Sequence, residues 1–319
     1  MANTLVLGGT GFVGRAVCEA LASLSASDRI VVPTRRLAHG DGVKMLPTVD
    51  LVVADVHDDA ALTRLVAGCD VVINLIAILH GNAANFQRVH VELPRRLIDA
   101  CHGAGVRRIV HVSALGLGPP GATAPSDYLR SKAAGEAVLF ASGLEVSVLR
   151  PSVIFGAHDR FTNLFARLQS LAPVIPLASS HARFQPVWVE DVAAAIVRCA
   201  TDASTIGKTY ECAGPREMTL SQIVRCAGRW AGHERPQIAL PTWAASLQAL
   251  VMECLPGEPL MSRDNLRSMQ TPNVASGSLP GLAALGIKPA AMDAVAPEYL
   301  GDLFQRPSLD RWRAGAGRG

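Results

Sequence analysis

The sequence lacks the residue patterns that mark disulfide frameworks and metal sites. It has seven cysteines but no Cys-x-x-Cys pair, and its histidines have no metal-like spacing. An odd number of scattered cysteines is typical of reduced thiols packed inside a cytosolic protein. We therefore expect no disulfide and no metal site, and we expect a cytoplasmic protein. The cysteines are at positions 18, 69, 101, 199, 212, 226 and 254.

Long hydrophobic runs are also missing. A membrane-spanning helix needs about 20 consecutive apolar residues. The nearest candidate, VVINLIAIL at 71–79, is short and rich in β-branched residues, as is typical of a buried parallel strand. A strand pattern begins at residue 3, which leaves no room for a cleavable signal peptide. The sequence thus predicts neither a membrane span nor a signal peptide.

An excess of charge of one sign is absent as well. The net charge is +3, aromatic residues make up 5% of the chain, and no long basic run occurs. These values argue against a nucleic-acid partner. The hydrophobic fraction of 49% and the charged fraction of 18% are typical of a folded protein with a sizeable core. A chain of 319 residues is long enough for one large or two moderate domains.

Strand and helix patterns alternate through the first half of the chain. Continuously apolar strands separated by helices are typical of a parallel sheet with helices on both faces. We predict an α/β fold built on a Rossmann-type, doubly wound parallel sheet. The predicted strands are residues 3–8, 29–34, 50–54, 70–76, 107–112 and 145–150, and the predicted helices are residues 12–24, 58–67, 84–104 and 126–141.

The rhythm changes after the last of these strands, where short helices and Pro/Gly punctuation predominate. We predict a dinucleotide-binding domain over residues 1–155, to which residues 185–200 return as a strand and helix. Residues 156–319 form a smaller C-terminal α+β domain for a substrate or partner. Residues 312–319 are expected to be disordered.

A glycine-rich turn, GGTGFVG at 8–14, follows the first strand directly and opens a helix. In this context Gly8 permits the tight turn, Gly11 lets the backbone approach a pyrophosphate, and Gly14 lets the helix pack closely on the strand. The helix N-terminus offers free N–H groups and a partial positive charge to phosphates. The turn therefore predicts dinucleotide binding.

The end of the second strand indicates which dinucleotide is bound. NAD-specific sites place an acidic residue there to accept from the ribose 2′-hydroxyl, whereas an arginine accommodates a 2′-phosphate. Here Thr34 is followed by Arg35 and Arg36, with no acidic residue. We predict NADP(H) as the preferred cofactor, with NAD(H) as the alternative; both arginines could also be solvated surface charges.

Several motifs occur in an order that resembles a known family. Together they are similar to the extended short-chain dehydrogenase/reductases, and more narrowly to the atypical branch typified by the accessory NADPH-binding subunit of mitochondrial respiratory complex I and its bacterial relatives. The motifs are GGTGFVG at 8–14, ADV at 54–56, HVSALG at 111–116, YLRSK at 128–132, LRPSVIFG at 149–156 and FQPVWVEDVAAAI at 184–196.

The resemblance implies roles for individual residues. Asp55 and Val56 would lie beside the adenine, and residues 75–77 would line the nicotinamide ribose. Tyr128 and Lys132 match the family's Tyr-x-x-x-Lys motif, whose lysine holds the ribose and lowers the pKa of the tyrosine that moves a proton. The implied cofactor-binding residues are Gly8, Thr10, Gly11, Phe12, Val13, Gly14, Arg35, Arg36, Asp55, Val56, Leu75, Ile76, Ala77, Ser113, Tyr128, Lys132 and Pro151.

Two positions depart from the pattern of active family members. Alanine stands at Ala114, where a hydroxyl residue usually polarises the substrate carbonyl, and His90 stands where asparagine is usual. Ser113 would supply the hydroxyl if the true register differs by one residue. These departures argue against catalysis, and we expect them to leave cofactor binding unaffected.

Two functions follow from these residues. The first is an NADP(H)-binding protein of the complex-I-accessory type, linked to respiratory or quinone metabolism, in which Tyr128 and Lys132 hold the cofactor. The second is an active NADPH-dependent oxidoreductase, epimerase or dehydratase on a nucleotide sugar or other carbonyl substrate, in which Tyr128 and Lys132 are catalytic. The substrate itself is not predicted.

An apolar stripe at helical spacing lies in the C-terminal half. Its first interpretation is domain core, and its second is a face for a respiratory-chain partner or for peripheral contact at the inner face of the membrane. The stripe consists of Trp243, Ala244, Leu247, Leu250, Val251 and Cys254.

Overall fold

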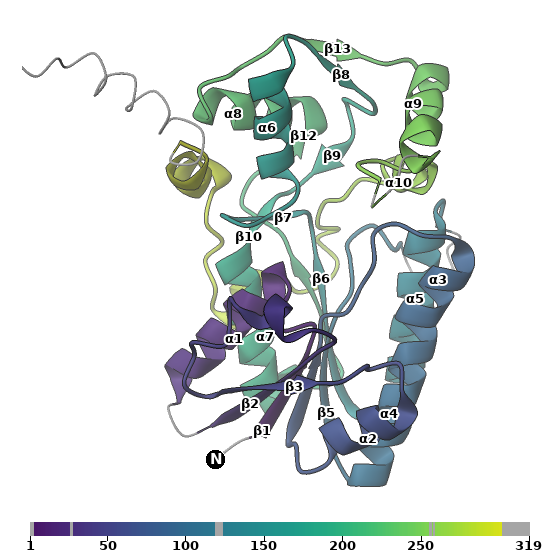
Figure 1. The fold of residues 1–319 in the computed structure, drawn as a ribbon, viewed down its shortest axis with the longest axis vertical. Helices are drawn as coiled ribbons and strands as arrows, with labels where there is room; N and C mark the ends of the chain where they lie inside the picture. Colours follow the sequence, from purple (N-terminus) through teal and green to yellow (C-terminus); the bar gives the residue numbers. More distant parts are fainter. Residues whose placement is uncertain (1–2, 26–27, 119–123, 255–256, 258, 302–319) are drawn as a thin grey trace, which may run out of the picture. The chain divides into compact units, whose positions relative to one another are not determined.

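The protein is described here by a computed structural model that covers residues 3–25, 28–118, 124–254, 257 and 259–301 (Figure 1). The chain divides into two compact units. Unit 1 comprises Met1–Pro151, Val189–Ala213 and Ala275–Lys288. Unit 2 comprises Ser152–Trp188, Gly214–Val274 and Pro289–Gly319.

Unit 1 is built on a seven-stranded sheet in the order β11-β6-β5-β4-β1-β2-β3, and every neighbouring pair in it is parallel. The order reverses between β1 and β4, where ligands of doubly wound sheets bind. The predicted Rossmann-type fold is therefore confirmed. The strands are β1 (Asn3–Leu7), β2 (Arg29–Thr34), β3 (Val49–Val53), β4 (Val71–Asn74), β5 (Arg108–Val112), β6 (Glu145–Pro151) and β11 (Thr209–Cys212).

Helices cover both faces of this sheet (Figure 1). α1 packs against α7 on one face, while α4 packs against α2 and α5 on the other. Continuously apolar strands require this double cover, because their side chains alternate between two buried faces. The helices are α1 (Phe12–Leu24), α2 (Asp59–Val66), α3 (Ala83–Gln87), α4 (Leu93–Ala104), α5 (Asp127–Phe140) and α7 (Val189–Thr201), with short helical turns η1 (Leu37–Gly40), η2 (Arg88–Glu92), η3 (Ala203–Thr205) and η4 (Leu282–Leu285).

Two elements of unit 1 differ from their predicted bounds. β4 ends at Asn74 rather than at residue 76, because the Asn74 side-chain oxygen accepts the Ile76 N–H and turns the chain out of the sheet. The predicted helix at 84–104 consists of α3 and α4 joined by η2, which is a π-helical turn. A π turn inserts an extra residue and often marks a functional position.

Unit 2 packs α6 against α8 around its own apolar core. Three two-stranded sheets complete it: β7 with β10, β9 with β12, and β8 with β13. Its elements are β7 (Ile154–Phe155), α6 (Thr162–Leu171), β8 (Ile175–Leu177), β9 (Arg183–Phe184), β10 (Val187–Trp188), β12 (Met218–Thr219), α8 (Leu220–Trp230), β13 (Gln237–Ala239), α9 (Thr242–Cys254) and α10 (Arg263–Ser268).

Two segments that the sequence assigns to the C-terminal domain belong to unit 1, namely residues 201–213, which include β11, and residues 275–288. Residues 275–288 lie along the edge strand β11, where the Glu211 N–H donates to the Pro280 carbonyl and the Ser276 N–H donates to the Glu211 carboxylate. This pairing covers an edge that would otherwise be open. The tail predicted to be disordered, 312–319, lies outside the described residues.

Candidate functional site

The glycine turn lies at the carboxyl end of β1, where α1 begins. Gly8 has a φ of +85°, a conformation that L side chains rarely adopt. A Cβ at Gly14 would lie 2.6 Å from the Gly9 Cα and would overlap the Gly8 carbonyl oxygen. No capping side chain satisfies the first N–H groups of α1, and Gly11 is exposed. The turn therefore presents free backbone donors at a helix N-terminus, as phosphate binding requires.

Arg35 and Arg36 follow β2 directly and are exposed. The Thr34 hydroxyl donates to the Arg36 carbonyl over 2.9 Å and accepts from the Arg36 N–H, which fixes the turn that carries both arginines. Within the described part of the chain, neither guanidinium has a carboxylate partner. Two cations thus remain available at the strand end where an acidic residue would favour NAD.

The loops after β3 and β4 carry the other residues predicted near the cofactor. Asp55 is exposed and accepts the His57 N–H over 3.0 Å, while Val56 packs against the core. After β4, the Leu75 N–H donates to the Leu7 carbonyl, and a Cβ on Gly8 would lie 3.4 Å from Ile76. The structure therefore brings the glycine turn and the loop after β4 together at the point where the strand order reverses.

Tyr128 and Lys132 lie on the first two turns of α5. Ser126 caps this helix by accepting the Leu129 N–H. The Lys132 Nζ is buried and donates to the Val112 carbonyl, at the end of β5, over 2.7 Å. Burial lowers the pKa of Lys132 to about 8. Glu136, one turn further on, is paired with Arg150 over 2.6 Å.

The charge of Lys132 does not lower the pKa of Tyr128 here, contrary to what the family resemblance implies. Burial raises the pKa of Tyr128 to about 12. The charge instead lowers the pKa values of His90 and His111, which burial has already lowered, to about 3 in the case of His90. Tyr128 is therefore a neutral phenol near pH 7 and is suited to donating a proton.

Ser113 and Ala114 follow β5, and both are buried. Alternation along the strand places Ser113 on the sheet face of Ile109 and His111, the face that α4 and α5 cover. The Ser113 Oγ has no hydrogen-bond partner among the described residues. A buried hydroxyl without a partner is unusual in a folded protein and calls for a functional explanation. Pro151, the last predicted site residue, is buried, and its carbonyl accepts the Leu115 N–H.

Two histidines, His90 and His111, lie close to this site. The Asn74 amide group approaches the His111 Nδ1 at 3.3 Å, and the Ile78 N–H donates to the His90 Nε2 at 3.2 Å. The distance between the two histidines in the sequence does not predict that they lie near the site, because they come from β5 and η2 and approach each other only in the folded chain. For His111 alone, strand alternation predicts a position on the same sheet face as Ser113.

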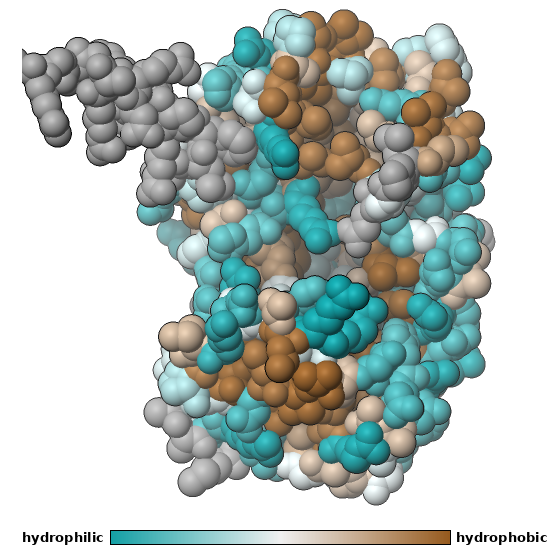
Figure 2. Space-filling model, viewed as in Figure 1, coloured by the Kyte–Doolittle hydropathy of each residue, from teal (hydrophilic) through white to brown (hydrophobic). Residues whose placement is uncertain are grey.

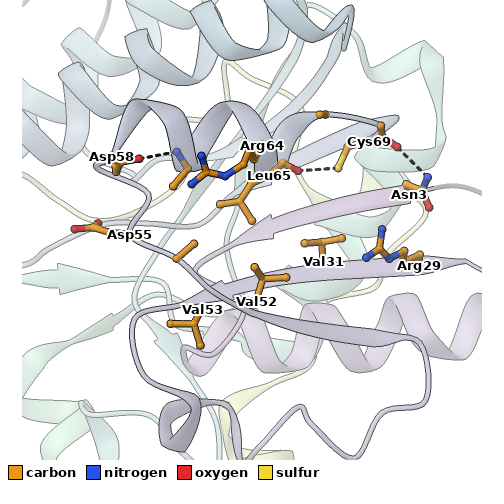
Figure 3. A pocket seen from close by; sticks show the side chains of 14 residues that line it. Asn3, Arg29, Val31, Val52, Val53, Asp55, Asp58, Arg64, Leu65 and Cys69 are labelled. Carbon is orange, nitrogen blue, oxygen red and sulfur yellow. Dashed lines mark hydrogen bonds between the residues drawn. The ribbon is translucent and has the colours of Figure 1, made fainter.

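The residues present fit a dinucleotide. The glycine turn leaves no room for a Cβ at Gly14. The Ser113 hydroxyl, which has no partner among the described residues, lies on the sheet face that is covered by α5, the helix of Tyr128 and Lys132. A separate groove of about 670 Å³ runs along β2, β3 and α2 in unit 1 (Figure 3). Val31, Val52 and Leu65 lie along it, and of the predicted cofactor residues it contains only Asp55. This groove is therefore not the predicted dinucleotide site.

In unit 2, the structure contradicts the interpretation of the 243–254 stripe as domain core. Trp243 is 73% exposed and Leu247 is 55% exposed, whereas the small side chains Ala245 and Ala249 face inward. Figure 2 shows apolar side chains gathered over α9. The small residues allow the helix to pack closely while its larger apolar side chains point outward. None of the described helices is long and apolar enough to cross a bilayer.

The sequence is similar to a known protein family and to several individual proteins. Residues 4–213 match the model of the NAD dependent epimerase/dehydratase family. The chain is 30% identical over 314 residues, 96% of this chain and 81% of the relative, to the mitochondrial NADH dehydrogenase [ubiquinone] 1 alpha subcomplex subunit 9 of Mus musculus. It is 31% identical to a ceramide reductase of Caulobacter vibrioides, over 74% of this chain and 73% of that one.

A solved structure supports the fold. The NADPH-dependent quinone oxidoreductase QOR2 of Escherichia coli, complexed with NADPH, has a TM-score of 0.73 at 21% identity. The match covers 94% of this chain and 99% of that one. At this identity the similarity concerns the fold alone.

Proposed function

The chain belongs to the NAD dependent epimerase/dehydratase family, and we propose that it binds NADP(H) on unit 1 as a complex-I-accessory-like member of that family. The observation that carries this proposal is the glycine turn at the N-terminus of α1, which has uncapped backbone donors and no room for a Cβ at Gly14. Similarity to a mitochondrial complex I subunit over nearly the whole chain supports the functional class.

In the proposed site, different elements of unit 1 bind different parts of the cofactor. The turn at 8–14 would hold the pyrophosphate, Arg35 and Arg36 the 2′-phosphate, and Asp55 with Val56 the adenine. Residues 75–77, Ser113, Lys132 and Pro151 would line the nicotinamide half. When bound, the cofactor supplies or accepts a hydride.

We expect NADP(H) to bind more tightly than NAD(H), by about tenfold to a hundredfold. A charge-assisted contact to the 2′-phosphate contributes about 1.5–3 kcal/mol. The double variant Arg35→Ala/Arg36→Ala should lose this preference and still bind NADH with unchanged affinity. Calorimetric titration with both cofactors measures the effect, and Arg64→Ala, which removes an exposed arginine of α2, is the control. Equal affinities in the unaltered protein would refute the preference.

A second candidate function is reduction of a carbonyl compound, which the unpartnered Ser113 hydroxyl favours. Ser113 would donate to the substrate oxygen in place of the hydroxyl missing at Ala114, and Tyr128 would donate the proton to that oxygen as the hydride arrives. The Lys132 cation would bind the ribose hydroxyls. This arrangement would suit an oxidoreductase.

We also infer that unit 2 contacts a membrane surface through the outward face of α9. The outward side chains are apolar, and Trp243 stands at the start of the helix, as is typical of helices that lie in a membrane interface. The named relatives agree with a membrane setting, since one is a subunit of a respiratory complex and another is named for a lipid, ceramide. A substrate dissolved in the membrane, or a respiratory-chain partner embedded in it, would be reached from such a surface.

Liposome flotation tests this contact. The unaltered protein should float with vesicles of phosphatidylcholine and phosphatidylglycerol, and Leu247→Glu/Leu250→Glu should reduce the bound fraction at least tenfold. Each buried leucine contributes about 1.5–3 kcal/mol. Both leucines are exposed, so the variant should fold. Leu171→Glu alters a still more exposed leucine, in α6, and should leave flotation unchanged. Absence of the unaltered protein from the floating fraction would refute membrane contact.

A further inference from the structure

His90 is held by more than one element of unit 1. It lies in η2, the π-helical turn between α3 and α4, and its ring is buried. A Cβ on Gly135 of α5 would overlap the His90 carbonyl oxygen, so the turn and α5 are in direct backbone contact. The π turn thus places the His90 ring between α5 and the loop after β4.

Hydrogen bonds fix the protonation of this ring. The Ile78 N–H donates to Nε2 over 3.2 Å, so Nε2 carries no proton. The proton is therefore on Nδ1, which lies 2.8 Å from the Ser131 Oγ. The Ser131 hydroxyl donates onward to the Tyr128 carbonyl over 2.8 Å, so Nδ1 donates to Ser131. Burial and the charge of Lys132 lower the pKa of His90 to about 3, which keeps this neutral tautomer at neutral pH.

Aromatic contacts hold the ring from its sides. The Phe86 ring stacks on His90 with centroids 5.6 Å apart, and the Tyr128 ring meets it edge to face at 5.6 Å. Because Phe86 and Tyr128 also pack edge to face, the three rings form one cluster. The orientation of the Tyr128 side chain therefore depends on the His90 ring.

We propose that His90 is a positioning residue that fixes the loop after β4 against α5, and so holds the two sides of the nicotinamide half of the site in register. The bond to Ile78 anchors the loop that contains residues 75–77, and the bond to Ser131 anchors the helix between Tyr128 and Lys132. The predicted effect of His90 on cofactor affinity rests on the proposed NADP(H) binding. The predicted anchoring of the loop after β4 does not depend on any cofactor.

The test uses His90→Phe, which keeps a ring of similar shape and removes both hydrogen bonds, and His90→Gln, whose amide can accept from Ile78 and donate to Ser131. The control is His102→Gln, because His102 is exposed on α4 and bonds only the Ser142 carbonyl among the described residues. NADPH probes the whole site, and 2′,5′-ADP probes the adenosine half alone.

We expect His90→Phe to weaken NADPH binding about fivefold to tenfold and to reduce the fluorescence enhancement of the bound nicotinamide, with 2′,5′-ADP affinity changed less than twofold. One lost hydrogen bond is typically equivalent to about a fivefold change. His90→Gln should restore most of the affinity. Unchanged NADPH binding in His90→Phe, or an equal loss for 2′,5′-ADP, would overturn the proposal.

Hydrogen exchange without cofactor separates this inference from the proposed function. The Ile78 amide should exchange at least fivefold faster in His90→Phe than in the unaltered protein and in His102→Gln. Failure of the unaltered protein to bind NADPH would refute the proposed function, and the exchange result would still decide the anchoring role. Unchanged exchange at Ile78 would refute the anchoring role. If His90→Phe does not fold, His90→Leu, which also removes both hydrogen bonds, takes its place, and unchanged NADPH affinity and unchanged Ile78 exchange in that variant would overturn the proposal.

Discussion

Gly14→Ala is expected to weaken NADPH binding at least a hundredfold. The added Cβ would lie 2.6 Å from the Gly9 Cα and would overlap the Gly8 carbonyl, so the turn and the first residues of α1 must move apart. The backbone N–H groups would then no longer converge on the pyrophosphate. Loss of two charge-assisted hydrogen bonds, at about 1.5–3 kcal/mol each, is equivalent to roughly a hundredfold or more. Fluorescence titration with NADPH measures the change.

Gly103→Ala provides the matched control. Gly103 is exposed within α4, and nothing lies within 4 Å of the Cβ that alanine would add there. An alanine in a helix interior is about 0.5–1 kcal/mol more favourable than glycine, so this variant should be slightly more stable and should bind NADPH normally. If Gly14→Ala retained its affinity while remaining folded, the turn would not be the phosphate site.

Tyr128→Phe is expected to reduce NADPH-dependent carbonyl reduction by about 10²–10⁴, with NADPH affinity changed less than threefold. The change removes the proton donor and keeps the ring that packs on Phe86 and His90. General acid catalysis typically contributes a factor of this size. The assay follows NADPH oxidation with quinones, long-chain aldehydes and ketones, and sugar nucleotides as probes. It also reports which substrate class the protein prefers.

The control for this experiment is Tyr210→Phe, which removes a phenol hydroxyl from the edge strand β11 of the same unit. It should leave turnover unchanged. Turnover that survives in Tyr128→Phe would assign the proton donation to another group. Absence of turnover with every probe would leave NADP(H) binding as the function and would contradict the second candidate. In that case Lys132→Ala should still lower the thermal stability conferred by NADPH, because a ligand stabilises the state that binds it.

Local sequence patterns determined the framework of unit 1. Each predicted strand lies within two residues of an observed one, and the glycine turn, the Arg35–Arg36 pair and the Tyr-x-x-x-Lys spacing fall at the predicted strand ends and on the predicted helix. Such features depend on periodicity and backbone geometry over a few neighbouring residues. For that reason a single sequence displays them.

The tertiary structure alone decided the features that depend on residues distant in the chain. His90 acquires its tautomer from Ile78 and Ser131. The Ser113 hydroxyl has no hydrogen-bond partner among the residues that the structure describes, because of the residues that surround it in the folded core. The segment 275–288 returns to unit 1 because β11 offers an open edge.

The same distinction explains the stripe on α9. Its periodicity showed that one face of the helix is apolar, but a helix with small residues on one side can pack by either face. Packing through Ala245 and Ala249 turned the larger side chains outward. The hydrophobic effect favours burial of any apolar surface, and only the shapes of the neighbouring elements determine which surface finds a partner.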